Sequence, residues 1–278
     1  MRFGARLAAA VAEHGPLCAG IDPHTPLLAA WGLPDTAEGV ERFGRTCVEA
    51  LAGSVSCLKP QAAFFERHGS RGLQALERVV ADARDADVLT IVDAKRGDIG
   101  STMAAYADAF AGDSPLAGDA VTVSPYLGFG SLRPVLDVAA AHGRGVFVLA
   151  LTSNPEGAGV QHARLGGTSV AGAVAAAAAA ENAGVSPLGD VGLVVGATVG
   201  SAVDDLGIDL GAVNGPLLAP GVGAQGATAE DLRRVFGDAR RLVLASSSRE
   251  ILAAGPDPRS LREAARRSAA AVREALGA

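Results

Sequence analysis

The chain alternates short β-rich runs with helical patterns, and this alternation constrains its fold more than any other feature. Eight runs are predicted as strands, at residues 17–22, 55–60, 88–93, 119–124, 145–151, 191–197, 216–221 and 241–246. Helical patterns separate them, at 36–52, 68–85, 101–111, 131–142, 166–183, 200–206, 228–236 and 257–276. Strands that alternate with helices form parallel sheets with right-handed crossovers. Eight such units in roughly 250 residues favour a closed (β/α)8 TIM barrel of the α/β class, and an open doubly wound sheet is the alternative.

Length and composition agree with one barrel. The 278 residues contain no Pro-, Gly- or Ser-rich linker, so we expect a single catalytic domain over residues 1–278. Hydrophobic residues make up 49% of the chain and aromatic residues only 4%, so the core must consist mainly of Ala, Val, Leu and Ile. The net charge of −6 argues against a nucleic-acid partner, but a local positive pocket could still bind a small anion.

The chain shows no signal for a membrane or a metal site. Cys18, Cys47 and Cys57 lie in apolar stretches without metal-ligand spacing, which is typical of reduced core cysteines in a cytoplasmic protein. Residues 1–15 predict an amphipathic helix and not a signal peptide. The apolar segment 173–183 is too short to span a bilayer. We therefore expect a cytoplasmic protein that binds neither membrane nor metal.

Charges cluster at the carboxyl end of the third predicted strand, in the segment TIVDAKRGDIGST. Charges beside a core cost free energy unless they are paired or used. Asp93 and Lys95 are two apart on an extended segment, so both should point to the same side. With Lys59 at the preceding strand tip and Asp98 beyond, they predict an alternating ion chain that keeps all four groups charged. A structural ion network is the alternative, but four charges at two adjacent strand tips favour a functional site.

Further polar residues follow other predicted strands at the same end, where the active sites of such barrels lie. Asp22 is either a ligand-binding carboxylate or a cap for the turn at Pro23. Ser153 is either a ligand contact or a turn serine in the segment 152–167, which is predicted as the longest irregular loop and a candidate lid. Arg96 is expected to point away from the charge cluster, and Ala94 to face the opposite side of the strand from Asp93 and Lys95.

The segment GVGAQG (221–226) matches the G-x-G-x-x-G pattern of dinucleotide-binding loops. It lies in the seventh unit, however, and the next strand ends at Ser246–Arg249 without the acid that an NAD ribose requires. Loops after strands seven and eight of barrels commonly bind phosphate through backbone N–H groups. We therefore interpret this loop as a phosphate site, in which Arg249 supplies a bidentate partner and Gln225 could reach both phosphate and base.

The run DAKRGDIGST (93–102) resembles the signature of the orotidine 5′-phosphate decarboxylase family, in which D-x-K-x-x-D closes the third strand. The resemblance extends along nearly the whole chain. LCAGIDPH, CLKPQAAFFE and LTSNP resemble the family's first, second and fifth strands, and APGVGAQG and SSREIL resemble its phosphate-binding end. The stretch SPYLGFGS (124–131) and the loop lengths are similar to those of the longer bacterial subtype.

The resemblance implies a carbon–carbon lyase that decarboxylates orotidine 5′-phosphate to uridine 5′-phosphate (UMP) in de novo pyrimidine biosynthesis, without cofactor or metal. It implies that Lys95 stabilises the carbanion and donates the proton to C6. Asp93 would lie near the departing carboxylate and orient Lys95. Lys59 would pair with Asp93 and contact the ribose.

The same resemblance implies the substrate contacts and a partner subunit. Asp22 would bind a ribose hydroxyl, Ser153 the pyrimidine edge, and the phosphate would be held by Pro220, Gln225 and Arg249. Asp98, Ile99 and Thr102 would reach into the site of a second subunit. The expected partners are thus orotidine 5′-phosphate, UMP and a second copy of the chain in a homodimer with shared active sites.

The sequence leaves three alternative functions open. One is a barrel decarboxylase or aldolase that acts on a sugar phosphate with Mg²⁺, but it would need an acidic ligand near strand two, where Lys59 stands and Glu66 is several residues beyond. The second is a non-catalytic nucleotide-binding protein, which would not need Lys95. The third is an NAD-dependent dehydrogenase, suggested by the glycine spacing alone.

Overall fold

Eight parallel strands close into a barrel. The structure, a computed structural model, describes residues 1–222 and 227–277. The barrel strands neighbour one another in the order β1-β10-β9-β8-β5-β4-β3-β2. They are β1 Leu17–Ile21, β2 Cys57–Pro60, β3 Leu89–Arg96, β4 Ala120–Val123, β5 Gly145–Leu151, β8 Val191–Val195, β9 Leu217–Pro220 and β10 Val243–Ser247. The predicted (β/α)8 barrel is therefore confirmed, and the alternative prediction of an open doubly wound sheet is wrong.

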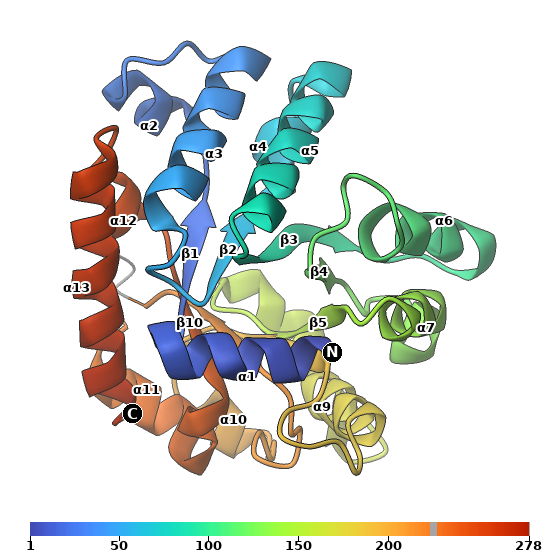
Figure 1. Cartoon of the computed structure of the whole chain (residues 1–278). Coiled ribbons are helices and arrows are strands. Elements are labelled where there is room, and N and C mark those ends of the chain that lie inside the picture. Colours follow the sequence, from blue (N-terminus) through green and yellow to red (C-terminus); the bar gives the residue numbers. More distant parts are fainter. Residues whose placement is uncertain (223–226, 278) are drawn as a thin grey trace.

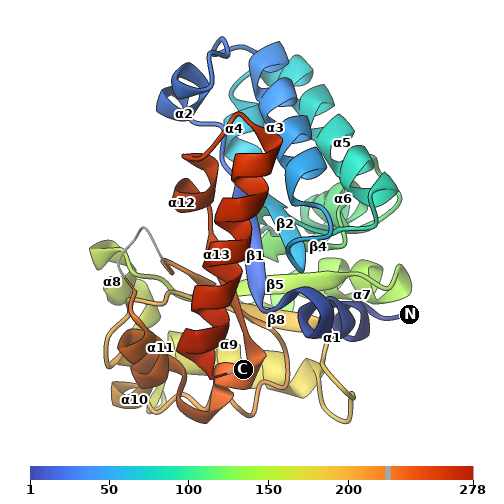
Figure 2. The same cartoon turned by 60° about the vertical axis from the view of Figure 1, so that its left-hand side comes forward.

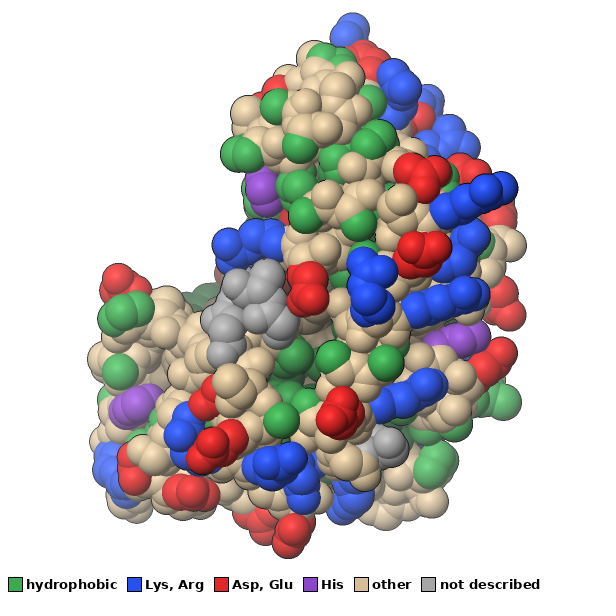
Figure 3. All heavy atoms as spheres, turned by 90° about the vertical axis from the view of Figure 1, so that its left-hand side faces the viewer, with side chains coloured by type: hydrophobic (Ala, Val, Ile, Leu, Met, Phe, Trp, Pro, Cys, Tyr) green, Lys and Arg blue, Asp and Glu red, His purple; other side chains and the backbone are tan. Residues whose placement is uncertain are grey.

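Helices surround this barrel (Figures 1 and 2). The longer ones are α1 Phe3–His14, α3 Ala37–Leu51, α5 Gly69–Asp85, α6 Gly100–Ala111, α7 Arg133–Ala141, α9 Val170–Glu181, α11 Ala229–Phe236 and α13 Pro258–Leu276. The short ones are α2 Thr25–Ala30, α4 Ala62–Glu66, α8 Ala158–Gln161, α10 Ala202–Asp205 and α12 Arg249–Leu252. Among the described residues no helix has the length and apolar character needed to cross a membrane. On the face that carries α13, basic and acidic side chains are interspersed (Figure 3), so this face shows no large patch of one sign.

Alternate strand residues build two separate apolar layers. Residues that face the barrel interior form one cluster with Phe3 and Leu7, namely Cys18, Cys57, Ile91, Ala120, Phe147, Val194, Leu218 and Leu244. The intervening residues, such as Ala19 and Leu58, pack outward against the helices. This alternation follows from the two-residue period of a strand. It fixes which residues further along each strand point into the interior.

The three cysteines are part of these layers. Cys18, Cys47 and Cys57 are free and buried. Burial raises the pKa of the Cys47 thiol and that of the Cys57 thiol, so both stay protonated. Their predicted role as reduced core residues is confirmed.

The predicted N-terminal helix exists as α1 and closes the amino end of the barrel. The Phe3 ring meets the Phe147 ring edge to face, with 5.9 Å between centroids. The Gly4 N–H donates to Asp190 Oδ1 at 2.8 Å, just before β8. The interior therefore opens into a cavity at the opposite end, where the strands finish.

The region 152–183 differs from the sequence prediction. The expected irregular loop 152–167 contains a 3₁₀ turn (Pro155–Gly157), the short helix α8 and the strand β6 (Arg164–Leu165). Strand β6 pairs with β7 (Thr168–Ser169) through a turn at Gly166 and Gly167, whose φ angles are 60° and 88°. These left-handed conformations suit glycine and interrupt a helix, so α9 begins after Ser169 and not at residue 166.

We expect Phe3→Ala to lower the free energy of unfolding by about 3–5 kcal/mol, because it removes a fully buried ring from the closed end of the barrel. Urea unfolding followed by circular dichroism measures the change. Val160→Ala, on the exposed helix α8, is the matched control and should change stability by less than about 0.5 kcal/mol. Equal stabilities of the two variants would show that α1 does not seal the barrel.

Candidate active site

A cavity of about 300 Å³ opens at the carboxyl end of the barrel strands. Its lining includes seven of the residues predicted from the sequence: Asp22, Lys59, Asp93, Lys95, Ser153, Pro220 and Arg249. They come from both halves of the chain and meet because parallel strands present their carboxyl ends at one face. The predicted residues Asp98, Ile99 and Thr102 do not line this cavity.

Asp93 lies between two ammonium groups on the cavity floor. Its Oδ2 accepts a hydrogen bond from Lys59 Nζ at 3.0 Å, and its Oδ1 accepts one from Lys95 Nζ at 2.6 Å. The side chains of Lys59 and Asp93 are 9% and 10% exposed, whereas that of Lys95 is 43% exposed. The buried pair thus anchors the more accessible Lys95, whose ammonium group faces the cavity.

Both members of the buried pair stay charged. Burial alone would raise the pKa of Asp93, but Lys59 and Lys95 outweigh it and hold the pKa of this carboxyl well below its usual range. Burial would lower the pKa of Lys59, but the Asp93 and Asp22 carboxylates raise it above that of an ordinary lysine. The site therefore carries fixed charges at neutral pH.

Two neighbours that the sequence analysis missed complete the surroundings of Asp93. The Thr122 hydroxyl donates to Asp93 Oδ1 at 2.8 Å and accepts the Lys95 N–H at 3.0 Å. With its amide nitrogen turned toward Asp93, Gln61 donates to Oδ2 at 2.6 Å. The interior register of β4 could have identified Thr122, because it lies two residues after the inward-facing Ala120.

The strand that carries Asp93 and Lys95 is not regular, contrary to the simple extended segment predicted. The pairing of β3 with β4 shifts between Val92 and Arg96, and Lys95 has a φ of 49°. A left-handed residue other than glycine costs about 1–2 kcal/mol, so neighbouring contacts must hold it in place. The expectation that Ala94 faces the opposite side is confirmed, because Ala94 packs in the outer core.

Arg96 supplies one of these contacts. Its Nη1 donates to the Ala94 carbonyl at 3.0 Å, and its guanidinium forms an ion pair with Glu66. The same guanidinium lies over the rings of Tyr106 and Phe110, 5.6 and 5.1 Å from their centroids. Arg96 therefore points away from the cavity, as predicted, and braces the irregular strand from outside.

Asp22 offers an unsatisfied acceptor to the cavity. Its Oδ1 is buried and has no hydrogen-bond partner among the described residues. The alternative interpretation as a turn cap predicts a side-chain bond to a nearby backbone N–H, and Oδ1 makes no such bond with the described part of the chain. A buried carboxylate oxygen without a partner is costly, and a ligand hydroxyl group would satisfy it.

The far end of the cavity carries the predicted phosphate-binding elements. Pro220 ends β9 and Gly221 follows it, and Arg249 begins α12 at the rim. The Ser247 hydroxyl is buried there without a partner in the described residues. Gln225 and most of the glycine-rich loop lie outside the described residues. The Arg249 guanidinium and the Ser247 hydroxyl thus lie at one end of the cavity, and the ion cluster lies at its floor.

The described residues do not form a cluster of metal-binding side chains. Within residues 1–222 and 227–277, no group of three or more His, Cys, Asp or Glu side chains could hold a metal ion. The magnesium-dependent alternative needs an acid near strand two; Glu66, which lies several residues beyond, is paired with Arg96 and does not line the cavity.

Comparison with known proteins agrees with this geometry. A sequence profile described as the orotidine 5′-phosphate decarboxylase / HUMPS family matches residues 15–265. The chain belongs to this family. A Salinispora arenicola protein named orotidine 5′-phosphate decarboxylase is 62% identical over 276 residues, covering 99% of this chain and 98% of the relative. A Streptomyces coelicolor protein of the same name is 60% identical over 278 residues, covering 99% of each chain.

Solved structures give the same result. A crystal structure of a Streptomyces avermitilis protein, provisionally given the same enzyme name, superposes with a TM-score of 0.95 at 59% identity. The superposition covers 100% of this chain and 96% of the Streptomyces avermitilis chain. The resemblance found in the DAKRGDIGST run is therefore confirmed at the level of the family.

The three remaining candidates of this family signature lie outside the cavity. Asp98 Oδ1 accepts the N–H of Ile99 at 2.8 Å, and Asp98 forms no ion pair with another described residue of the chain. Ile99 is 61% exposed, and Thr102 is exposed in the first turn of α6. Three members of the predicted Lys59–Asp93–Lys95–Asp98 chain are thus assembled within one subunit, and the fourth is not.

We expect the pH dependence of stability to report the Asp93 pairing. Because the folded pKa of Asp93 is depressed, pairing stabilises the protein above the ordinary aspartate pKa of about 3.9 and is lost as the pH falls below it. Between pH 5 and 2, the free energy of unfolding of the wild type should fall by at least about 1 kcal/mol more than that of Asp93→Asn. Urea titrations across this range measure both slopes. Asp137→Asn, which removes an exposed carboxylate, should keep the wild-type slope, and parallel slopes for the wild type and Asp93→Asn would contradict the pairing.

Proposed function

We propose that the protein decarboxylates orotidine 5′-phosphate to UMP without a cofactor. The observation that carries this proposal is the Asp93 carboxylate held between Lys59 and Lys95 on the floor of a cavity whose rim bears Arg249. The enzyme names of the relatives supply the substrate, and this charge arrangement supplies a mechanism. The proposal makes the chain a carbon–carbon lyase, as the sequence resemblance implied.

In the proposed reaction, the bond between C6 and the carboxylate carbon of the substrate breaks, and CO2 leaves. The electron pair stays at C6 in an orbital that the ring does not delocalise. Lys95 then donates a proton from its ammonium group to C6, which gives UMP, and solvent returns a proton to Lys95. The fixed charges act without reorganising during the reaction, which is why they lower its barrier.

The lysine content of the chain supports a proton-donating role. The sequence has 22 arginines and two lysines, and both lysines contact Asp93. Arginine stays protonated under all ordinary conditions, so it provides charge but no transferable proton. Lysine therefore stands where a proton-donating cation is proposed.

The substrate contacts follow from the ends of the cavity. In the proposed complex, Asp22 binds a ribose hydroxyl through its unpartnered oxygen, and Ser153 binds the pyrimidine edge. Pro220, Gln225 and Arg249 hold the phosphate. Because the phosphate is remote from C6, its binding energy can close the site and orient the ring without taking part in bond breaking.

We also propose that the enzyme is a homodimer in which Asp98, Ile99 and Thr102 complete the partner's site. The support is that Asp98 lacks an ion-pair partner among the described residues, and that Ile99, four residues after Lys95, is a large apolar residue with an exposed side chain. Asp98 of a second subunit would then complete the predicted Lys–Asp–Lys–Asp chain. Residues 1–278 are proposed to form one catalytic domain, and the reduced cysteines support a cytoplasmic location.

The direct test is the fall in absorbance of the orotate ring when the purified protein meets orotidine 5′-phosphate. We expect full activity with excess EDTA, and a loss of at least about 10³-fold in Lys95→Ala with UMP binding retained. Lys95→Arg is the matched variant, because it keeps the charge and lacks a transferable proton. Wild-type activity in Lys95→Arg would contradict proton donation, and loss of activity in EDTA would favour the magnesium-dependent alternative.

A mixing experiment tests the shared site. Lys95→Ala and Asp98→Asn homodimers should each be nearly inactive. After subunit exchange, about a quarter of wild-type activity should return, because half of the dimers carry one site free of both substitutions. Recovered activity is followed with the same absorbance assay. No recovery between variants that demonstrably exchange subunits would place Asp98 in its own subunit's site.

A further inference from the structure

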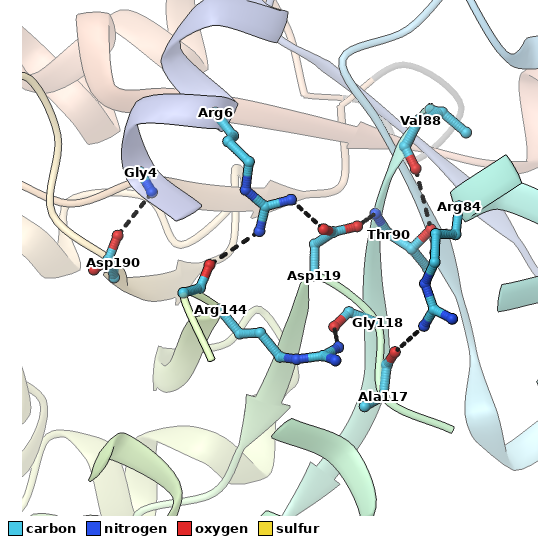
Figure 4. Close-up of polar contacts among 11 residues, drawn as sticks. Gly4, Arg6, Arg84, Val88, Thr90, Ala117, Gly118, Asp119, Arg144 and Asp190 are labelled. Carbon is cyan, nitrogen blue, oxygen red and sulfur yellow. Dashed lines mark hydrogen bonds and ion pairs between the residues drawn. The ribbon is translucent and has the colours of Figure 1, made fainter. Parts of the chain in front are cut away.

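Three arginines gather at the amino end of the barrel, opposite the candidate active site. Arg6 on α1, Arg84 in the last turn of α5 and Arg144 just before β5 direct their guanidinium groups toward the segment 117–119 (Figure 4). All three line a cavity of about 290 Å³, which shares no lining residue with the candidate active site. Neither the proposed reaction nor the substrate contacts use this cluster.

Two of the guanidinium groups contact only backbone carbonyls in the described structure. Arg84 Nη2 donates to the Ala117 carbonyl at 3.2 Å, and Arg144 Nη1 donates to the Gly118 carbonyl. A guanidinium has five N–H donors, so most donors of both groups are uncommitted in these contacts. The Arg144 Nε is buried and has no partner among the described residues.

One carboxylate lies within the cluster, and its hydrogen bonds are already made. Asp119 Oδ1 pairs with Arg6 Nη1, and Asp119 Oδ2 accepts the Thr90 N–H at 2.9 Å. Asp113 lies at the rim, where its exposed carboxylate is 3.5 Å from His142. The lining of the cavity thus holds three guanidinium groups against the single carboxylate of Asp119.

The positive charges of Arg6 and Arg84 disfavour the charged form of Arg144. Burial lowers the pKa of Arg144; Asp119 opposes this effect, and the neighbouring Arg84 and Arg6 add to it. A bound anion would relieve this repulsion and satisfy the uncommitted donors. Planar guanidinium groups bind the oxygens of phosphate and carboxylate in a bidentate manner, and several around one cavity select a compact multivalent oxyanion.

We propose that this cavity is a second anion site, which binds inorganic phosphate or the phosphate group of a small phosphate ester. Because its arginines come from α1, α5 and the start of β5, a bound phosphate would link the helix that closes the barrel to two other parts of the fold. Occupancy would stabilise the closed amino end, at a distance from the chemistry.

The test measures binding of inorganic phosphate by isothermal titration at constant ionic strength in Arg249→Ala, a background that weakens the proposed active-site phosphate contact. Arg84→Gln is then added, because Arg84 is exposed and its replacement leaves the contacts of Arg6 and Arg144 intact. Arg266→Gln, which removes an exposed arginine of α13, is the matched control for net charge. Arg144→Gln is a second variant of the site, and circular dichroism confirms that each variant is folded.

We expect Arg249→Ala to bind one phosphate, and Arg84→Gln in that background to weaken this binding by about tenfold, the equivalent of one charged hydrogen bond. Arg266→Gln should leave it unchanged. Two results would overturn the proposed site: equal phosphate affinity with and without Arg84, or no binding of millimolar phosphate by Arg249→Ala. The arginines would then have only the structural role of donating hydrogen bonds to the carbonyls of residues 117 and 118. These outcomes do not depend on catalysis, so a failure here is separate from a failure of the proposed decarboxylase activity.

Discussion

The pairing of one buried carboxylate with two ammonium groups is the interaction on which the rest of the site depends. Placing ions inside a barrel is expensive, and removing one partner from such a cluster leaves an uncompensated charge. Asp93 offsets this cost by sharing its two oxygens between Lys59 and Lys95, which gives this cluster of three residues one net positive charge. In the proposed reaction, the positive charge of Lys95 stabilises the developing carbanion, so the same ion cluster would serve both burial and catalysis.

The surrounding scaffold holds this cluster in an unfavourable backbone geometry. Lys95 has a left-handed conformation at a bulge of β3. Thr122 holds the strand from inside through the Lys95 N–H, and Arg96 holds it from outside through the Ala94 carbonyl. Strain of this kind persists only where several contacts determine the same conformation. The irregular strand is therefore part of how the site is built.

The sequence predicted the strands and the charged floor well, because both depend on local patterns. The strand at 145–151 matches β5 at both ends, and the chain of Lys59, Asp93 and Lys95 lies where alternation and strand order place it. It did not predict Thr122, whose importance appears only when the register between β3 and β4 is known. Asp98 shows the limit most clearly, because its spacing in the D-x-K-x-x-D run predicted a place in the ion chain, whereas it forms no ion pair with another described residue. The composition held a further signal: the chain has only two lysines beside 22 arginines, and both lysines lie in the predicted ion cluster.

The closure of the barrel by α1 has a consequence for the order in which the molecule assembles. This helix precedes every barrel strand in sequence, yet Phe3 contacts Phe147, and Gly4 bonds to Asp190, which lies 186 residues later. Contacts of such long range form late, because the loop between the partners must first be ordered. Until Phe147 and Asp190 are in place, α1 lacks these contacts, and an apolar surface exposed during folding favours aggregation.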